Sequence, residues 1–197
     1  MSDDYIIRNG ARILYPSEYK ALRSELNYTH QMIFDTMLFT GMRVVEVWRF
    51  IEHPEWLKPT RKCIDLPTGS MLKVKAKQAE RTVLLSNWGL QSVEQMLAYM
   101  KHNEISPITR PGWWQNLQRA ATKAVEKGTL TSTKGIVPKM LRKTWISWLL
   151  ATHPAREGSI AISSGHSVGV MLRHYTGLGF PAHEIEGMRI YTAGWGE

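Results

Sequence analysis

Five side chains in this sequence form a set suited to the chemistry of a phosphodiester. Arg43 lies in the first quarter of the chain, and Lys139, Arg142, His166 and Tyr175 follow in order towards its end. Arginine and lysine can hold phosphate oxygens, histidine can donate a further hydrogen bond, and a tyrosine hydroxyl can attack phosphorus. Because a phenol has a pKa of about 10, that attack needs a concentrated positive field. The set therefore predicts covalent phosphoryl transfer, with Tyr175 as an exposed nucleophile.

Glu46 is the expected support for Arg43. It follows Arg43 by three residues in the string T-G-M-R-V-V-E, which is about one helical turn. At that spacing its carboxylate can hold the guanidinium in a set orientation. The alternative is an ordinary surface ion pair, which arises freely in helices and contributes little.

The other four residues also have plain structural interpretations. Lys139 and Arg142, with Lys143, fit a solvated basic face. Two such cations on one helical face also repel each other, and a phosphate between them would relieve that repulsion. His166 and Tyr175 fit packing groups with satisfied polar atoms. The ordered combination, rather than any single residue, carries the chemical interpretation.

A lysine on a predicted hairpin is the expected general acid. Residues 71–77 alternate apolar and lysine side chains, and residues 82–85 are expected to return as the second strand. Lys77 and Lys75 point to the same face of such a strand. Lys77 lies nearer the turn and is favoured to protonate the departing sugar oxygen, with Lys75 as the alternative.

The apolar periodicity predicts one domain that is mainly α with a small antiparallel β-sheet. Residues 53–67, with three prolines, are expected to be a connection. Trp113 and Trp114, beside Arg110, favour core packing over stacking on DNA. Helices are expected over residues 16–26, 30–40, 43–50, 90–102, 113–125, 138–152, 159–164, 168–175 and 182–191.

The composition fits an intracellular protein that binds a polyanion. Lys and Arg number 25 against 17 Asp and Glu, which gives a formal net charge of +8. No apolar run reaches the roughly 20 residues that a membrane span needs, and the single cysteine, Cys63, excludes an internal disulfide. The sequence has no CxxC, HExxH or GxxxxGK[ST] pattern, so we expect no metal, no cofactor and no nucleotide energy source.

These motifs resemble the catalytic domain of the tyrosine recombinases, also called phage-type integrases. The string T-G-M-R-V-V-E at 40–46 looks like the family's TGxRxxE box, and K-M-L-R at 139–142 looks like its H/K-x-x-R box. Gly165-His166, followed by Tyr175, is similar to the Gly-His…Tyr ending. The tail H-Y-T-G-L-G-F-P-A-H-E-I-E-G-M-R-I-Y-T-A-G-W is especially similar to integrases of archaeal viruses and plasmids, a branch that lysine at position 139 also fits.

The resemblance implies a site-specific DNA recombinase that integrates or excises a mobile element. Tyr175 would attack the scissile phosphate, form a 3′-phosphotyrosyl link and release a 5′-hydroxyl. Arg43 and Arg142 would clamp the phosphate, His166 would hydrogen-bond it, and Lys139 would assist proton transfer. The implied partners are double-stranded DNA at attachment sites and three further copies of the chain, as a homotetramer on synapsed DNA in the cytoplasm.

The resemblance runs from about residue 16 to the end of the chain. We therefore expect residues 16–197 to be the catalytic domain and residues 1–15 to be an N-terminal arm, with no N-terminal core-binding domain. Two other functions remain open. A DNA-binding module without catalysis would form no covalent link to DNA, and an enzyme like a type IB topoisomerase would relax supercoiled DNA without recombinant product.

Overall fold

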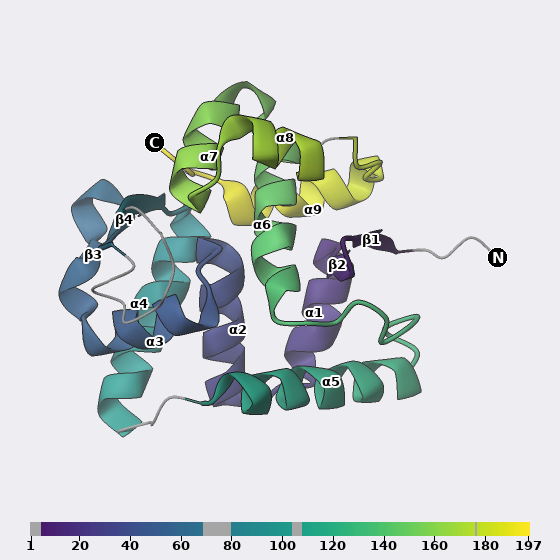
Figure 1. Ribbon diagram of the computed structural model, residues 1–197. Coiled ribbons are helices and arrows are strands. Elements are labelled where there is room, and N and C mark those ends of the chain that lie inside the picture. Colours follow the sequence, from purple (N-terminus) through teal and green to yellow (C-terminus); the bar gives the residue numbers. More distant parts are fainter. Residues whose placement is uncertain (1–4, 69–79, 104–107, 176) are drawn as a thin grey trace.

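The computed structural model describes residues 5–68, 80–103, 108–175 and 177–197. They form a mainly α-helical fold with two small antiparallel sheets (Figure 1). The helices are α1 (Pro16–Ser24), α2 (Tyr28–Thr40), α3 (Val44–Glu52), α4 (Asn87–Asn103), α5 (Arg110–Glu126), α6 (Lys139–Thr152), α7 (Glu157–Ser164), α8 (Val168–Tyr175) and α9 (Ala182–Thr192). The strands are β1 (Ile6–Arg8), β2 (Ala11–Ile13), β3 (Leu57–Lys58), β4 (Cys63–Leu66) and β5 (Arg81–Leu84).

Each helix expected from the periodicity is present, and the prediction of a mainly α fold with little sheet is confirmed. The largest shifts in the bounds occur at helix starts, where polar caps precede the apolar stripe. Asn27 caps α2 by accepting a hydrogen bond from the N–H of His30 at 2.9 Å. Thr109 caps α5 in the same way, at 3.2 Å from the N–H of Gly112. Such caps satisfy N–H groups that the helix itself leaves unpaired.

The expectation that residues 53–67 are only a connection is wrong. This stretch contains β3 and β4, which pair with each other, and β4 pairs with β5 so that Ile64 lies opposite Val83. Its apolar run is short and lies among prolines, which hid the strands in the sequence. The first strand of the expected hairpin, at 71–77, lies outside the described residues.

The segment before α1 contributes to the core. Its strands β1 and β2 form a hairpin, and β2 packs against α6. The side chains of Ala11, Ile13 and Leu14 are fully buried. Arg12 between them is buried as well, and its guanidinium is paired with the carboxylate of Glu18. Residues 11–14 are therefore part of the packed domain.

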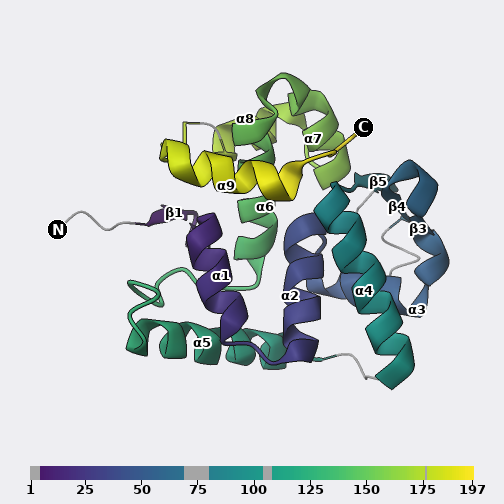
Figure 2. The ribbon, with the colours of Figure 1, turned by 180° about the vertical axis from the view of Figure 1, so that it is seen from behind.

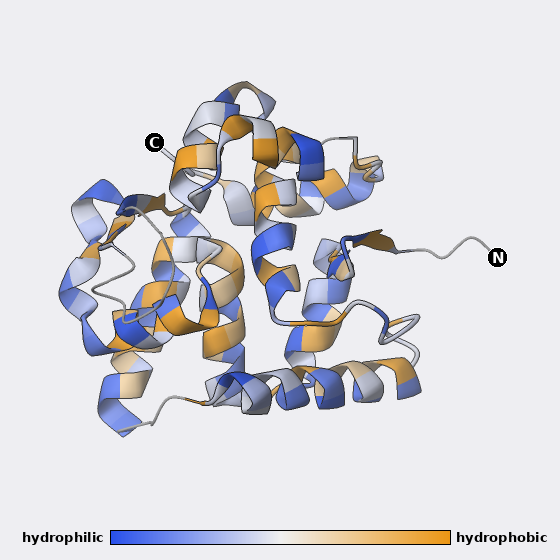
Figure 3. Cartoon of the chain, viewed as in Figure 1, coloured by the Kyte–Doolittle hydropathy of each residue, from blue (hydrophilic) through white to orange (hydrophobic). Residues whose placement is uncertain are grey.

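Helix α6 is the central element of the molecule. It packs against α2, α9, α7 and α8 as well as β2, and the views from front and back both place it in the middle of the molecule, between α1 and α2 (Figures 1 and 2). Helix α5 lies across one end, with hydrophilic residues along much of its visible side (Figure 3). Among the helices that the structure describes, none is long and apolar enough to cross a membrane.

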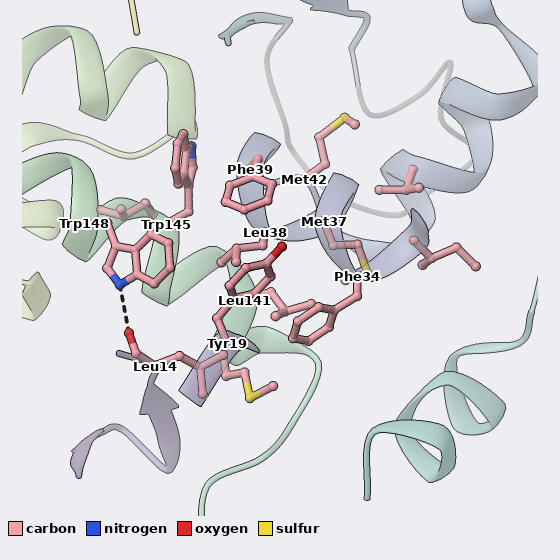
Figure 4. Close-up of a cluster of buried hydrophobic side chains, with 14 of the residues drawn as sticks. Leu14, Tyr19, Phe34, Met37, Leu38, Phe39, Met42, Leu141, Trp145 and Trp148 are labelled. Carbon is pink, nitrogen blue, oxygen red and sulfur yellow. Dashed lines mark hydrogen bonds between the residues drawn. The ribbon is translucent and has the colours of Figure 1, made fainter. Parts of the chain in front are cut away.

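An aromatic cluster fills the space beside α6 (Figure 4). The Tyr19 ring stacks on Phe34 with ring centroids 5.7 Å apart and meets Trp148 edge-on at 6.3 Å. The indole N–H of Trp148 donates to the carbonyl of Leu14 at 2.8 Å, which ties the N-terminal segment to α6. Large aromatic rings of this kind supply much of a core's apolar contact area.

The two neighbouring tryptophans of α5 have different environments. Trp113 is fully buried, as expected, whereas the expectation of core packing is wrong for Trp114, which is 49% exposed. Successive residues on a helix point about 100° apart, and α5 buries only one face, so the two rings have different surroundings.

Replacing Trp148 by alanine should lower the free energy of unfolding by about 3 to 5 kcal/mol, because a buried indole leaves a large cavity. The matched change Trp114→Ala removes the same side chain from the surface and should cost less than about 0.5 kcal/mol. Urea unfolding followed by far-UV circular dichroism measures both values. Equal losses for the two variants would contradict the packing described here.

Candidate active site

A glycine at the end of α2 sets the position of Arg43. Gly41 has φ of 62°, the left-handed conformation that ends a helix and that glycine adopts without a steric penalty. A Cβ atom on Gly41 would lie 3.2 Å from Cδ1 of Trp145. The chain then turns into α3, with Arg43 as the residue immediately before its first turn. The T-G-x-R pattern thus encodes a tight passage between two helices.

The carboxylate of Glu46 is the centre of the site. Its Oε2 accepts the backbone N–H of Arg43 at 2.7 Å, and its Oε1 accepts the guanidinium of Arg43 at 3.0 Å. Arg81 donates to both oxygens, each at 2.9 Å. Nη1 of Arg142 lies 3.9 Å from Oε2. Three guanidiniums therefore surround a carboxylate whose side chain is 1% exposed.

The charges at this centre shift one another's pKa. Burial raises the pKa of Glu46, but Arg81 and the hydrogen bond from the Arg43 backbone outweigh burial, so the net pKa lies below its usual value. Burial lowers the pKa of Arg142 to about 9, with Arg81 and Arg43 adding to the effect. Because one carboxylate faces three cations, the site has an excess of positive charge that an anion would compensate.

Arg142 is held by backbone carbonyls from two other segments. Its Nη1 donates to the carbonyl of Gly41 at 3.0 Å, and its Nη2 donates to the carbonyl of Ser164 at the end of α7. Gly165, with φ of 66°, ends α7, and a Cβ there would lie 3.1 Å from Cδ of Arg81. Gly41 therefore ends α2 next to Arg142, and Gly165 ends α7 next to Arg81.

Arg81 is the residue of this cluster that the sequence interpretation missed. Besides its pair with Glu46, its Nε donates to the carbonyl of Ser163 at 3.1 Å, and the residue is buried. The available signal was the alternation in β5, since Arg81 shares the inward face with Val83. A buried arginine requires a carboxylate partner, which the sequence offers in Glu46.

The hydrogen bonds of His166 define its protonation. Ser164 Oγ donates its only proton to the carbonyl of Ala161 at 3.1 Å, so it accepts from Nδ1–H of His166 at 3.0 Å. Burial, followed by the charge of Arg142, lowers the pKa of His166 to about 4. At neutral pH the ring is therefore uncharged, and the tautomer with its proton on Nδ1 satisfies both contacts of Ser164 Oγ and leaves the lone pair on Nε2.

Tyr175 is buried, which corrects the expectation of an exposed tyrosine. Its side chain is 6% exposed because α8 packs against α6 and α7 and turns the ring into the core. The ring lies 6.1 Å from that of His166 between centroids, in an edge-to-face arrangement. Burial raises the pKa of Tyr175, and the charge of Arg142 acts in the opposite direction. The hydroxyl is therefore protonated at neutral pH.

Lys139 borders the cluster from the start of α6. It lines a cavity of about 680 Å³ together with Arg43 and Arg142, over an apolar floor that includes Met42 and Trp48. Its ammonium group donates to the carbonyl of Asn9 at 3.0 Å. The structure thus brings together Arg43, Glu46, Lys139, Arg142, His166 and Tyr175.

The expected general acids, Lys77 and Lys75, lie outside the described residues. In the ranges that the structure does describe, histidine, cysteine, aspartate and glutamate side chains form no group of three or more that could hold a metal ion.

Solved structures with a similar fold include a transposon integrase and a recombinase. The Tn1549 transposon integrase (residues 82–397), in complex with circular intermediate DNA, aligns over 96% of this chain and 69% of its own length, with a TM-score of 0.67 and 16% identity. The same integrase with transposon right end DNA gives a TM-score of 0.64 at 16% identity, over 96% of this chain and 68% of that one. XerA recombinase gives 0.58 at 15% identity, over 96% and 64%.

No family model matches the chain, and no curated protein matches it in sequence. The likeness to solved structures therefore establishes the fold, which is that of a tyrosine recombinase catalytic domain. At 15% to 16% identity it does not by itself extend to the activity of those proteins.

Replacing Glu46 by glutamine should lower the free energy of unfolding by about 3 kcal/mol at pH 7, because it removes the carboxylate that Arg81 and Arg43 share. The folded-state pKa of Glu46 lies below the ordinary 4.5, so this contribution is complete above pH 4.5 and is lost as the pH falls through the folded-state pKa. Urea unfolding at several pH values measures the difference between wild type and variant. Glu52→Gln, at an exposed ion pair on the same helix, should cost less than about 1 kcal/mol. A difference for Glu46→Gln that grows below pH 4.5 would contradict the assignment.

Replacing Arg43 by glutamine should raise the pKa of His166 from about 4 towards 6.5, because the variant lacks one of the cations that disfavour the imidazolium. A pH titration of the His166 ring protons by NMR measures the shift. Arg49→Gln, which changes a surface arginine of the same helix, should leave the His166 pKa in place. An unchanged pKa in Arg43→Gln would contradict a contribution of the Arg43 charge to the lowered pKa of His166.

Proposed function

We propose that this protein is a site-specific DNA recombinase, an integrase that cleaves and rejoins DNA through a 3′-phosphotyrosyl intermediate and so integrates or excises a mobile element. The observation that carries the proposal is the cluster of Arg43, Arg81 and Arg142 on the buried carboxylate of Glu46, with Tyr175 next to it. A cluster with excess positive charge beside a buried tyrosine suits a phosphodiester better than it suits structural packing.

In the proposed mechanism Arg43 and Arg142 hold the non-bridging oxygens of the scissile phosphate. Arg43 is 49% exposed and lines the cavity, so DNA can reach it, whereas Arg142 is largely enclosed. A guanidinium has five N–H donors, so Arg142 keeps donors for a phosphate beyond its two backbone carbonyls. Fixed donors stabilise the charge that develops on phosphorus because they need no reorganisation during the reaction.

Tyr175 is the proposed nucleophile and His166 the proposed acceptor of its proton. The Tyr175 Oη–P bond forms while the bond from phosphorus to the 5′ oxygen breaks, and the phenol proton passes to Nε2 of His166. That Nε2–H can then donate to a phosphate oxygen, the hydrogen bond expected from the sequence. With the pKa of His166 near 4 and that of Tyr175 above its usual value, this transfer is strongly unfavourable in the free protein. A bound phosphate would offset the guanidinium charges and raise the pKa of His166, which makes His166 a better acceptor for the phenol proton.

The remaining proton transfer is assigned to lysine. Lys77, with Lys75 as the alternative, would protonate the departing 5′ oxygen, and both remain proposals from the sequence. Lys139, on the cavity beside Arg43, would assist proton transfer near the phosphate. In the second half of the reaction a 5′-hydroxyl attacks the phosphotyrosyl link, the P–Oη bond of Tyr175 breaks, and the DNA is rejoined.

The proposed partner is double-stranded DNA at attachment sites. The net charge of +8 favours a polyanion, and the similar integrase structures contain DNA. We further propose a homotetramer on synapsed DNA, in the cytoplasm of the host, and an element related to archaeal viruses or plasmids. The tail after Tyr175 and the lysine at position 139 support that last assignment. In this proposal the recombinase-like catalytic region is residues 16–197, and residues 11–14 of the preceding segment pack into the same core.

Incubating the protein with DNA of the host and of the element at low salt, followed by SDS denaturation, should trap a covalent protein–DNA adduct. Tyr175→Phe should lower its yield at least about 1,000-fold, because the nucleophile is absent. Tyr28→Phe, which removes an exposed hydroxyl elsewhere, should leave the yield unchanged. Sequencing the linked DNA identifies the target.

The outcomes separate the candidate functions. An adduct that survives Tyr175→Phe would overturn the assignment of the nucleophile. DNA binding without any adduct would favour a binding module that lacks catalysis. An adduct accompanied by relaxation of supercoiled DNA, with no recombinant product from paired attachment sites, would favour an enzyme like a type IB topoisomerase.

A further inference from the structure

The turn between β1 and β2 contacts two separate parts of the candidate active site. Its residues Asn9 and Gly10 have φ of 49° and 67°, and Arg8 pairs with Ala11 across it. An Asn-Gly pair with two positive φ values is the residue combination that a tight two-residue hairpin favours. The turn is therefore a defined structure, held at the end of a strand pair that is packed on α6.

The first contact is with the start of α6. Lys139 donates to the carbonyl of Asn9 at 3.0 Å, and Lys143, one helical turn later, donates to the carbonyl of Arg8 at 3.0 Å. The two ammonium groups lie near the positive end of the α6 dipole, where cations are unfavourable. The carbonyl oxygens of the turn partly offset this unfavourable interaction between the lysine charges and the helix dipole. They also set the direction of both lysine side chains.

The second contact is with the end of α8. The side-chain amide of Asn9 donates from Nδ2 to Nδ1 of His174 at 3.1 Å. His174 directly precedes Tyr175, and the two rings meet edge-on with centroids 6.4 Å apart. A single residue of the turn thus joins the lysine of α6 to the helical turn that carries the tyrosine.

We infer that the β1–β2 turn is a positioning device for the active site, in which Asn9 sets Tyr175, through His174, in register with Lys139. The inference rests on the proposed function, which it deepens by assigning a role in the reaction to a residue outside the motifs. Asn9 contacts neither the scissile phosphate nor the phenol in this role. It restricts the last turn of α8, so the hydroxyl samples fewer orientations away from the phosphate held by Arg142.

The variant Asn9→Gly tests the side-chain contact alone. Glycine accepts the positive φ and leaves the carbonyl that Lys139 uses, but it removes the amide that reaches His174. At saturating DNA we expect the rate of adduct formation to fall about threefold to tenfold, the range that loss of one neutral hydrogen bond gives. DNA affinity and the melting temperature should stay close to wild type. Asn103→Gly, the same change at the end of α4 on the far side of the molecule (Figure 1), should leave the rate unchanged.

A double-mutant cycle separates positioning from general damage. If Asn9 acts through His174, then Asn9→Gly and His174→Ala should each slow adduct formation, and the double variant should be no slower than the slower single variant. A wild-type rate in Asn9→Gly, or losses that multiply in the double variant, would overturn the inference. So would a loss confined to DNA affinity.

NMR of the DNA-free protein tests the contact without any reaction. Asn9→Gly should shift the Nδ1 resonance of His174 and the ring-proton resonances of Tyr175, while Asn103→Gly should not. If the wild type forms no adduct, the proposed function fails, and the same NMR comparison still decides whether Asn9 fixes this end of α8. Unchanged His174 and Tyr175 resonances in Asn9→Gly would overturn the positioning role whatever the activity.

Discussion

The arrangement of the site depends on the buried carboxylate of Glu46. Arg43 comes from the start of α3, Arg81 from β5 and Arg142 from α6, and each would otherwise bring an uncompensated charge to the same place. Removing a charge from water is costly unless a partner with good geometry replaces the lost solvation. Glu46 supplies that partner for Arg81 in bidentate form and orients Arg43 through both backbone and side chain. The three elements are thereby fixed relative to one another around this carboxylate, at the proposed phosphate site.

The single carboxylate of Glu46 does not neutralise all three guanidiniums, and the remaining positive charge shifts the pKa values of neighbouring groups. Arg142 and His166 both have lowered pKa values, chiefly because they are buried and also because neighbouring guanidiniums act on them. A buried Tyr175 with a raised pKa keeps its proton under the same conditions. In the free protein the proposed nucleophile is therefore a protonated phenol. In the proposed mechanism, an anion bound at the guanidiniums would reduce the excess positive charge and so raise the pKa values of His166 and Arg142.

The sequence predicted the helices well because their apolar stripes are long and regular, as in α4 and α6. It predicted the site's composition through order and spacing, since Arg43 with Glu46, and Gly165-His166 with Tyr175, are local patterns. Arg81 was missed because its partner lies 35 residues away in the sequence, and such a pair has no periodic signal. The N-terminal hairpin was missed because its strands have three residues each, too few to show alternation. The burial of Tyr175 follows from the packing of α8 on α6 and α7, which no local pattern contains.

Gly41 and Gly165 are each constrained in two independent ways. Each has a positive φ that disfavours any side chain, and each faces a neighbour so closely that a Cβ atom would press on Trp145 or on Arg81. A compensating mutation can relieve the crowding by shortening the neighbour, but the backbone conformation would remain strained. A change of the Gly41 backbone to a negative φ would move the carbonyl oxygen that accepts a hydrogen bond from Arg142. A single substitution at either glycine would therefore meet both a strained backbone conformation and a steric clash, and a second mutation could remove only the clash.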